Sequence, residues 1–305
     1  MPEFAIETKG LVKHFDKVRA VDGLELKVRQ GEMFSLVGPD GAGKTTTMRM
    51  LCGILEPTSG EAKILGYDLR KESEEIKKRI GYLSQRFSLY GDLSVDENIE
   101  FFAEIHEVKD YKLRREKLLE FTRLTLFRTR LGEQLSGGMK QKLALACTLI
   151  HTPEIIFLDE PTTGVDPVSR RDFWKILSDL LKTGITIVMT TPYLDEAERC
   201  STVGLMNQGK LMVVDSPQQV KALMQDAVME LVIDQIRKGF NLLKALPEII
   251  EVQAFGDRLN VVVKDQARDF PVIENELKRN GISILDHRVI PPSLENVFIS
   301  LLKAG

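Results

Sequence analysis

The sequence predicts an α/β protein with a mixed sheet core, an antiparallel edge sheet and a helical subdomain, followed by a small α+β domain at the C-terminus. Three observations support this fold class. Continuous apolar runs at 33–38, 155–159 and 185–190 are typical of parallel strands that are buried on both faces. Residues 92–150 place apolar side chains three or four positions apart, which indicates helices. After residue 216 the pattern changes to short stretches that alternate between strand and helix.

The first domain is expected to cover residues 1–220. Residues 4–30 alternate between apolar and polar side chains (FAIETKGLVKHF, then AVDGLELKV), which predicts edge strands of an antiparallel sheet. The run MFSLVG stops at a glycine, and a helical stretch from Lys44 to Cys52 follows. The segment is therefore predicted to form a strand, a glycine-rich loop and a helix. The helical subdomain, at about residues 90–150, is inserted before the next central strand.

Residues 221–305 are expected to form a ferredoxin-like α+β accessory domain. The stretches that predict strand, helix, strand, strand, helix and strand are, in this order, VMELVID, RKGFNLLKAL, IIEVQAF, RLNVVVK, FPVIENELKRNG and ISILDHRVI. A last helix, SLENVFISLLKA, has Ser293 as its expected N-cap and Glu295 in its first turn. No stretch of this domain carries a catalytic motif, so it serves either in subunit contact and restraint or as a passive addition.

The composition argues against several classes of protein. The 42 Lys and Arg residues nearly balance 45 Asp and Glu, and the net charge of −3 predicts no nucleic-acid partner. No window approaches the roughly 18 consecutive apolar residues of a membrane span, and the charged start MPEFAIETKG is unlike a signal peptide. Three cysteines (Cys52, Cys147, Cys200) without metal-site spacing predict buried thiols in a reducing compartment. We therefore expect a cytoplasmic protein that can act at a membrane only through another chain.

The segment GPDGAGKT matches the phosphate-binding pattern G-x-x-x-x-G-K-[ST]. It follows an apolar strand and opens a helix, which is the context that this motif requires. Glycines let backbone N–H groups approach a polyphosphate, and the helix N-terminus adds partial positive charge. Lys44 is expected to reach the β- and γ-phosphates and Thr45 to bind Mg²⁺. The predicted ATP-binding residues of this segment are Gly38, Pro39, Asp40, Gly41, Ala42, Gly43, Lys44, Thr45 and Thr46.

The apolar run IIFLDEP ends in two adjacent carboxylates. Successive side chains of a strand point in opposite directions, so Asp159 and Glu160 can have different tasks. We expect Asp159 to hold Mg²⁺ through water, and Glu160 to act as the general base that polarises the attacking water. Two carboxylates at a strand end are weak evidence alone, but they become strong evidence beside a phosphate loop.

The segment LSGGMKQ provides a second helix start that suits an anion. Elsewhere a serine N-cap with a glycine turn would explain it. Because the chain already has a phosphate loop, a second anion site makes sense if it faces a nucleotide held by another subunit. The residues concerned are Leu135, Ser136, Gly137, Gly138 and Gln141.

Together with TTGVD, and in this order, these motifs resemble the ATP-binding subunit of an ABC transporter, a P-loop NTPase. The resemblance covers about residues 4–220. It implies a head-to-tail dimer with two ATP molecules, each between the phosphate loop of one subunit and the LSGG segment of the other. It also implies that Phe15 stacks on adenine, that Gln85 binds ATP and touches Mg²⁺ together with Thr45 and Asp159, and that Asp166 lies in a loop that crosses the dimer interface.

Further segments resemble the drug-export branch of this family, namely GPDGAGKTT, QRFSLYGDLSV, GGMKQKLALACTL, YLDEAERC and PPSLENVFISLL. This resemblance implies an ABC-2 type permease as membrane partner, multidrug export as function, and a cytoplasmic location on the inner face of the cell membrane. Leu89 to Asn98 would lie near the coupling helix of the permease. A second ATP-binding half, the same chain or a homologue, completes the dimer. The chain is either a separate subunit or one half of a tandem chain.

Position 192 departs from the family pattern. A histidine that contacts the γ-phosphate is expected after the third central strand, but this chain reads Thr190, Thr191, Pro192, Tyr193. Proline has neither a side-chain donor nor a backbone N–H, so this degenerate switch position cannot make the contact. Loss of one such donor costs roughly two to three orders of magnitude in rate. We therefore expect a site that binds Mg-ATP well and hydrolyses it slowly, unless Tyr193, Thr191 or a water replaces the histidine.

Two other functions compete with export. One is a nucleotide-binding regulatory subunit of ABC type without meaningful turnover. The other is a soluble, non-transport ABC ATPase of translation or DNA repair. Such proteins typically carry two ATPase units or a long coiled-coil insertion, and neither pattern is found in this sequence.

Overall fold

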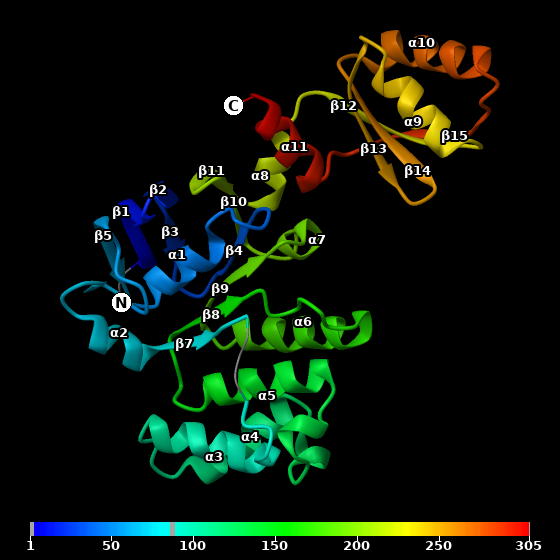
Figure 1. The fold of residues 1–305 in the computed structure, drawn as a ribbon. Coiled ribbons are helices and arrows are strands. Elements are labelled where there is room, and N and C mark those ends of the chain that lie inside the picture. Colours follow the sequence, from blue (N-terminus) through cyan, green and yellow to red (C-terminus); the bar gives the residue numbers. More distant parts are fainter. Residues whose placement is uncertain (1–2, 86–88, 305) are drawn as a thin grey trace. The chain divides into compact units, whose positions relative to one another are not determined.

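The computed structural model describes residues 3–85 and 89–304, which divide into two units, Met1–Pro217 and Gln218–Gly305. In the first unit, Figure 1 shows strands β1, β2 and β5 at one end and helices α3 and α4 at the other, with β8 and α6 between them. Within the described residues, no helix combines the length and the apolar character that crossing a membrane requires.

The central sheet of the first unit has the order β11-β10-β4-β9-β8-β7. Its strands are parallel from β10 to β7, and β11 is antiparallel to β10, so the sheet is mixed as predicted. Every residue of β4, β8 and β9 is buried, which explains why these strands are continuous apolar runs. The bounds are β4 (Met33–Val37), β7 (Ile80–Leu83), β8 (Ile155–Asp159), β9 (Thr186–Thr191), β10 (Thr202–Asn207) and β11 (Lys210–Asp215).

The antiparallel edge sheet predicted for the N-terminal segment is confirmed. Its order is β2-β1-β5-β6, and β3 also pairs with β1. The bounds are β1 (Phe4–Phe15), β2 (Val18–Leu24), β3 (Lys27–Arg29), β5 (Ser59–Ile64) and β6 (Tyr67–Asp68). Between the two sheets lies an apolar core that includes Ile6, Leu24, Phe34, Leu36 and Met48.

The helical subdomain is also confirmed. A serine and a glutamate, Ser94 and Glu97, form a capping box that starts α3, and Ser136 is the N-cap of α5. The helices of the first unit are α1 (Lys44–Leu51), α2 (Ser73–Arg79), α3 (Val95–Ile105), α4 (Tyr111–Phe121), α5 (Gly137–Leu149), α6 (Pro167–Leu181) and α7 (Leu194–Ala197), with 3-10 turns at Thr125–Phe127 and Gly132–Gln134.

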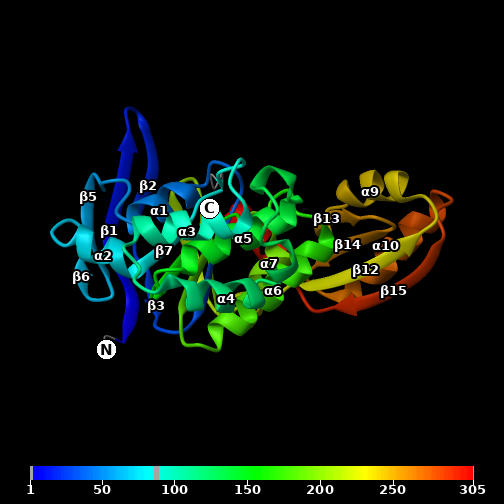
Figure 2. The same cartoon turned by 90° about the horizontal axis from the view of Figure 1, so that it is seen from below.

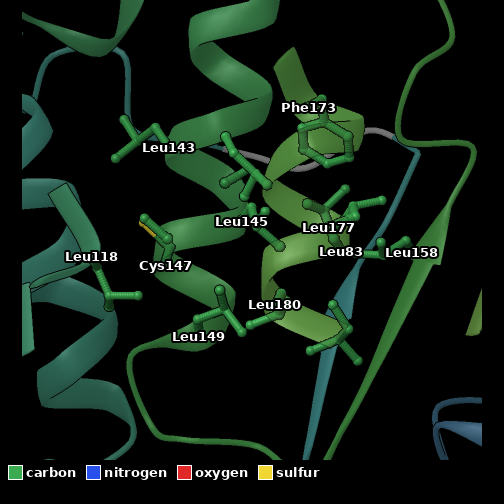
Figure 3. Close-up of a cluster of buried hydrophobic side chains, with 14 of the residues drawn as sticks. Leu83, Leu118, Leu143, Leu145, Cys147, Leu149, Leu158, Phe173, Leu177 and Leu180 are labelled. Carbon is green, nitrogen blue, oxygen red and sulfur yellow. The ribbon is translucent and has the colours of Figure 1, made fainter. Parts of the chain in front are cut away.

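A second apolar core joins this subdomain to the central sheet. Figure 3 shows Leu145 of α5 facing Leu177 and Phe173 of α6, and Leu118 of α4 pointing toward α5. All of these side chains are buried. Because α5 and α6 share this core, the N-termini of both helices are held in fixed positions relative to the sheet.

The second unit contains an antiparallel sheet in the order β13-β14-β12-β15 and two helices, α9 and α10, which pack on it through one apolar cluster. Chain order and strand order are those of a ferredoxin-like fold. Figure 2 shows these elements together. The bounds are β12 (Ala227–Ile233), α9 (Ile236–Lys244), β13 (Ile249–Phe255), β14 (Arg258–Val263), α10 (Gln266–Arg279) and β15 (Ile284–Ile290).

Two further helices flank this sheet in sequence, α8 (Pro217–Ala222) and α11 (Leu294–Ala304). The hydroxyl of Ser293 accepts a hydrogen bond from the Asn296 N–H at 3.2 Å, which is the N-cap contact expected for the last helix. The amide of Asn296 donates in turn to Gln253 on β13 at 3.0 Å. The last helix is thereby tied to the sheet of the second unit.

Candidate nucleotide-binding site

Residues 38–43 form a tight loop between the end of β4 and the start of α1. A Cβ on Gly38 would lie 2.1 Å from the Met206 carbonyl oxygen, and a Cβ on Gly43 would lie 2.3 Å from the Ala20 carbonyl oxygen. Gly43 also has a φ of 104°, which side-chain-bearing residues rarely adopt. The sequence pattern therefore contains glycine at these positions because the loop closes against neighbouring backbone.

The loop residues surround a cavity of about 660 Å³. Such a volume suits a nucleotide-sized ligand. The α1 N-terminus opens onto this cavity, where its free N–H groups favour an anion. Residues that line the cavity are Phe15, Val18, Arg19, Ala20, residues 40–46, Gln85, Glu160 and Gln208.

Lys44 is almost fully buried in this loop. Its Nζ donates hydrogen bonds to the carbonyl oxygens of Gly38 (2.8 Å) and Pro39 (3.1 Å), and it lies 3.5 Å from the Glu160 carboxylate. A buried cation needs such partners to remain charged. Lys44 is thus a fixed positive charge at the floor of the cavity, beside the N-terminus of α1.

Asp159 and Glu160 point to different partners, although they are adjacent. Asp159 is fully buried at the end of β8, and it accepts hydrogen bonds from the hydroxyls of Thr45 (3.1 Å) and Thr190 (2.6 Å). Glu160 has a φ of 49°, an uncommon conformation that turns its side chain toward the cavity. Its carboxylate accepts from the amide of Gln85 at 2.9 Å.

Hard oxygen donors gather where a divalent cation is expected. Thr45, Asp159 and Gln85 contribute a hydroxyl, a carboxylate and an amide, and the first two lie within hydrogen-bonding distance of each other. Such a donor set suits Mg²⁺, which prefers a few protein oxygens together with phosphate oxygens. The residues present therefore fit the ion.

Phe15 ends β1 and is 46% exposed, with its ring at the cavity and Lys13 Nζ 5.2 Å above the ring centroid. An aromatic ring that is exposed beside a phosphate loop is available for stacking.

The predicted signature residues form a second cluster, outside the residues that line this cavity. Ser136 accepts a hydrogen bond from the Met139 N–H at 3.3 Å as the N-cap of α5, and both Ser136 and Gly137 are exposed. A Cβ on Gly138 would lie 2.3 Å from the Ser169 Cβ on α6, so this glycine allows α5 and α6 to approach. Leu135 is buried beneath them, and Gln141 lies one turn further along the helix.

Asp166 is exposed and caps α6. Its carboxylate accepts from the N–H groups of Ser169 and Val168, both at 3.0 Å. These hydrogen bonds lower the pKa of Asp166, and the one from Ser169 has the largest effect. The residue is also the start of the helix that approaches Gly138, so the signature segment and the predicted dimer loop are neighbours.

Pro192 lies between β9 and α7 and is half-buried. It is absent from the described residues that line the nucleotide cavity. Of the two neighbours that could replace a histidine, Thr191 is engaged through its hydroxyl and Tyr193 through its ring. The hydroxyl of Thr191 donates to Glu196 at 2.8 Å and accepts from the Tyr193 N–H at 3.1 Å, and the Tyr193 ring lies 4.3 Å from the Arg170 guanidinium.

Sequence reasoning missed Glu196, a carboxylate that is 1% exposed. It accepts hydrogen bonds from four side chains of three segments, namely Thr162, Thr191, Arg170 and Trp174. Its partners lie up to 34 positions away in sequence, so no local pattern marks it. The single observable signal is a glutamate in a short amphipathic stretch directly after a buried strand.

Two more residues were missed. The Tyr82 hydroxyl lies 3.4 Å from Asp159, and burial, followed by the charge of Asp159, raises the pKa of Tyr82 to about 12. Asn98 is fully buried, and its amide donates to the carbonyl oxygens of Tyr90, Leu93 and Ser94 while its oxygen accepts from the Tyr90 N–H. It thereby fixes residues 90–94, whereas positions 86–88 of the QRFSLY segment lie outside the described residues.

Comparison with known proteins gives a consistent family assignment. The sequence model described as "ABC transporter" matches residues 21–163. The chain is 31% identical to the daunorubicin resistance ATP-binding protein DrrA2 of Streptomyces coeruleorubidus, over 99% of this chain and 96% of that protein. It is 35% identical to the Nod factor export ATP-binding protein I of Cupriavidus metallidurans, over 92% of this chain and 91% of that protein.

The chain is also 43% identical to the probable multidrug ABC transporter ATP-binding protein YbhF of Escherichia coli over 223 residues, but it spans only 38% of that protein's length. Among solved structures, cbiO1 of Clostridium perfringens superimposes with a TM-score of 0.66 at 26% identity, covering 72% of this chain and 92% of cbiO1. The ATP-binding cassette MJ0796, in a dimeric post-hydrolysis state bound to ADP and Pi, gives a TM-score of 0.63 at 25% identity, covering 69% of this chain and 98% of that one.

Proposed function

Because the chain belongs to the ABC transporter family and is an ATPase of that family, we propose that it energises efflux through a separate membrane permease and that its own ATP site hydrolyses slowly. The proposal has three parts: nucleotide binding, the chemistry at Glu160, and the consequence of proline at position 192.

Binding of the nucleotide is supported by the phosphate loop. Lys44 presents a fixed positive charge, and the α1 N-terminus presents free N–H groups at the same cavity. Phe15 supplies an exposed ring for the adenine. Mg²⁺, when bound by Thr45, Asp159 and Gln85, neutralises charge on the β- and γ-phosphate oxygens.

Glu160 is the residue we assign as general base. Its carboxylate lies at the cavity, 3.5 Å from Lys44 and 2.9 Å from the Gln85 amide, where it can accept a proton from a water near the γ-phosphate. The strained φ at Glu160 is of the kind that clusters at functional sites. Gln85 positions this carboxylate through its amide N–H.

Slow hydrolysis follows from what surrounds Pro192, and this is the observation that carries the proposal. Proline offers no donor, the Thr191 hydroxyl is committed to Glu196, and the Tyr193 ring is packed against Arg170. A γ-phosphate in this site therefore has no donor from position 192 or from Thr191, which leaves the Tyr193 hydroxyl or a water as the replacements that would restore turnover. Loss of one preorganised donor corresponds to roughly 10²- to 10³-fold in rate.

The signature segment retains all that a partner's site needs. Ser136 and Gly137 are exposed at the N-terminus of a 13-residue helix, which suits an anion brought by a second subunit. We therefore propose an asymmetric transporter in which this chain completes a competent site of a second ATP-binding half. The alternative within the family is a nucleotide-binding regulatory subunit without meaningful turnover at this chain's own site.

The permease is proposed to be of ABC-2 type and to dock beside residues 89–98. A hollow of about 340 Å³ lies there, between this segment and α5. Asn98 holds the segment in place through its four hydrogen bonds, which gives the docking surface a defined shape. The names of the relatives, resistance to daunorubicin and export of Nod factor, support export as the function.

The decisive experiment compares the steady-state Mg-ATPase of the chain with that of Pro192→His, Pro192→Ala and Glu160→Gln, with nucleotide binding measured separately by a fluorescent ATP analogue. We expect all four proteins to bind the analogue, the wild type to hydrolyse near background, and Pro192→His to be at least tenfold faster. Pro192→Ala is the matched control, since it restores the backbone N–H without an imidazole. It should stay near background.

Ordinary turnover by the wild type, abolished only in Glu160→Gln, would refute the impaired site and make the chain a complete homodimeric motor. Equal gains in Pro192→Ala and Pro192→His would attribute the effect to the stiffness of proline rather than to the missing donor. If Pro192→His does not hydrolyse ATP even when a hydrolysis-competent ATP-binding half is added, the regulatory subunit is the correct assignment.

A further inference from the structure

Strand β15 is an edge strand with an unusual degree of exposure. In the order β13-β14-β12-β15 it has a single neighbour among the described strands, β12. The five residues between Ile284 and Ile290 are all exposed, and two of them are large and apolar, Leu285 (67% exposed) and Val289 (48%). An open edge with apolar side chains is a template for pairing with another strand.

The sequence of this strand, ILDHRVI, is self-complementary in an antiparallel sense. Centred on His287, a second copy would place Asp286 opposite Arg288. It would bring Leu285 toward Val289, although Leu285 lies in a bulge, because the register of β15 with β12 shifts between Asp286 and Ile284. Apolar residues would thus face apolar residues, and each acidic residue would face a basic one. The two-fold symmetry would produce each of these contacts twice.

The backbone of the strand is also oriented for this pairing. The His287 N–H donates to the carboxylate of its own neighbour Asp286 at 2.9 Å, so it is not used in the ladder with β12. Because N–H and C=O groups of one residue point to the same side of an antiparallel strand, the His287 C=O is outward as well. Two copies of His287 can therefore exchange both hydrogen bonds, as a hydrogen-bonded pair does.

The rest of the second unit holds β15 in this position. The His287 ring stacks on Phe270 of α10 with a centroid distance of 4.3 Å, and Arg288 donates to Glu230 on β12 at 2.7 Å. Both contacts leave the backbone edge free. The strand is thus presented as a fixed edge rather than as a loose segment.

We propose that β15 pairs with β15 of a second copy of this chain, in antiparallel register about His287, to form a continuous sheet across a two-fold axis. This contact goes beyond the ATP-dependent dimer and is independent of it. Asp286 acts as a cap on the free edge, because its carboxylate must leave the His287 N–H before it can face Arg288 of the second copy. One strand pair is less than the roughly 1,200 Å² of a stable interface, so the expected dissociation constant is in the micromolar range or weaker.

Cysteine cross-linking of the nucleotide-free full chain tests the register. In a hydrogen-bonded antiparallel pair the two Cα atoms are about 5.5 Å apart, within the disulfide range of roughly 4.4–6.8 Å. His287→Cys should therefore form a disulfide-linked dimer under mild oxidation. Asp286→Cys is the matched control: its copies would be offset by two positions and about 7–8 Å or more apart, so it should cross-link at least tenfold more slowly.

Two more variants check the ends of the strand. Leu285→Cys and Val289→Cys should each form little disulfide-linked dimer alone and should cross-link only when the two are mixed. The native cysteines Cys52, Cys147 and Cys200 are buried and free, and the wild type provides the background. Equal rates for His287→Cys and Asp286→Cys, or no difference between the mixture and the single variants, would overturn the proposal.

Sedimentation velocity over a range of concentrations provides a test without cysteine chemistry. Val289→Lys places a charge opposite Leu285 at both symmetric contacts and should raise the dissociation constant at least tenfold. Val272→Lys is the matched control, because Val272 is 38% exposed on α10 of the same unit but lies off the edge strand. A wild type that stays monomeric at all concentrations, or equal effects of the two lysines, would contradict the pairing.

Discussion

Glu196→Ala should be the most damaging single substitution outside the phosphate loop. The Glu196 carboxylate is buried and accepts hydrogen bonds from Thr162 at 2.7 Å, Thr191 at 2.8 Å and Trp174 at 3.3 Å, as well as from the Arg170 guanidinium. Alanine removes the acceptor and leaves four donors, one of them charged, without their common partner. The loss is therefore of a network rather than of one bond.

The magnitude follows from these contacts. Leaving the Thr162, Thr191 and Trp174 donors without an acceptor costs about 1 kcal/mol or more each. Loss of the Arg170 ion pair adds to this even though Arg170 keeps Asp195 at 3.7 Å, so the total is about 3–5 kcal/mol. For the unit Met1–Pro217, an unfolding entropy of about 2.1 cal/mol/K per residue amounts to roughly 0.46 kcal/mol/K. The expected loss therefore corresponds to a fall in Tm of about 7–11 °C. Glu196→Gln retains one acceptor oxygen and the shape, so it should lose less.

The protein contains a built-in reporter for this experiment. Trp174 is the only tryptophan of the chain, and its indole N–H is one of the four donors to Glu196. Urea unfolding followed by its fluorescence therefore measures the stability of the first unit alone. We expect the order wild type, Glu196→Gln, Glu196→Ala in decreasing stability. A loss below about 1 kcal/mol in Glu196→Ala, the size of one ordinary hydrogen bond, would refute the network argument.

Three further predictions concern other contacts of the first unit. Gly138→Ala would bring a Cβ to 2.3 Å from Ser169 and should destabilise by about 1–3 kcal/mol in urea unfolding, whereas Gly137→Ala, with nothing within 4 Å, should be neutral or stabilising. Asp166→Ala removes the α6 N-cap and should cost about 0.5–2 kcal/mol, with Asp166→Asn close to the wild type. Burial, and then the charge of His106, lower the pKa of His151 to about 4. As the pH falls, the unfolded chain therefore binds this proton before the folded protein does. The free energy of unfolding should fall by about 1–3 kcal/mol between pH 6.5 and 4. His151→Gln should flatten this part of the unfolding profile, and an unchanged slope would contradict the assignment.

Much of the fold could be predicted from the sequence because its signals are local. The central strands β4, β8 and β9 are buried on both faces, so each is a continuous apolar run. Alternation, helical spacing and turn glycines are equally local, and they indicated the edge sheet, the helical subdomain and the C-terminal strands. The strands β10 and β11 were not predicted, although Gln208 and Gly209 between them form a two-residue turn with positive φ at both positions.

The residues of the candidate site also divide into those with a local sequence signal and those without one. Phosphate-loop glycines are required by close approach of backbone from β2 and β10, and this requirement appears in sequence as a recognisable motif. Glu196 and Asn98 are fixed by partners that tertiary folding brings to them, and neither has a motif of its own. Tyr82 likewise owes its raised pKa to burial and to Asp159, 77 positions away. The roles of these residues depend on partners that are distant in sequence, so they can be recognised only in the folded structure.

The hydrogen bonds of Glu196 also limit the structural effect of proline at position 192. Thr191 and Tyr193, on either side of Pro192, are held by Glu196 and Arg170, and Arg170 belongs to α6, the helix capped by Asp166. The segment after β9 therefore stays connected to the predicted dimer loop even though the donor at position 192 is missing. A substitution that removes a donor but keeps this connection should lower the hydrolysis rate without disturbing the response of the dimer loop to a partner. The arrangement proposed above, an ATP-binding half that is silent in its own site and intact in its neighbour's, depends on this connection.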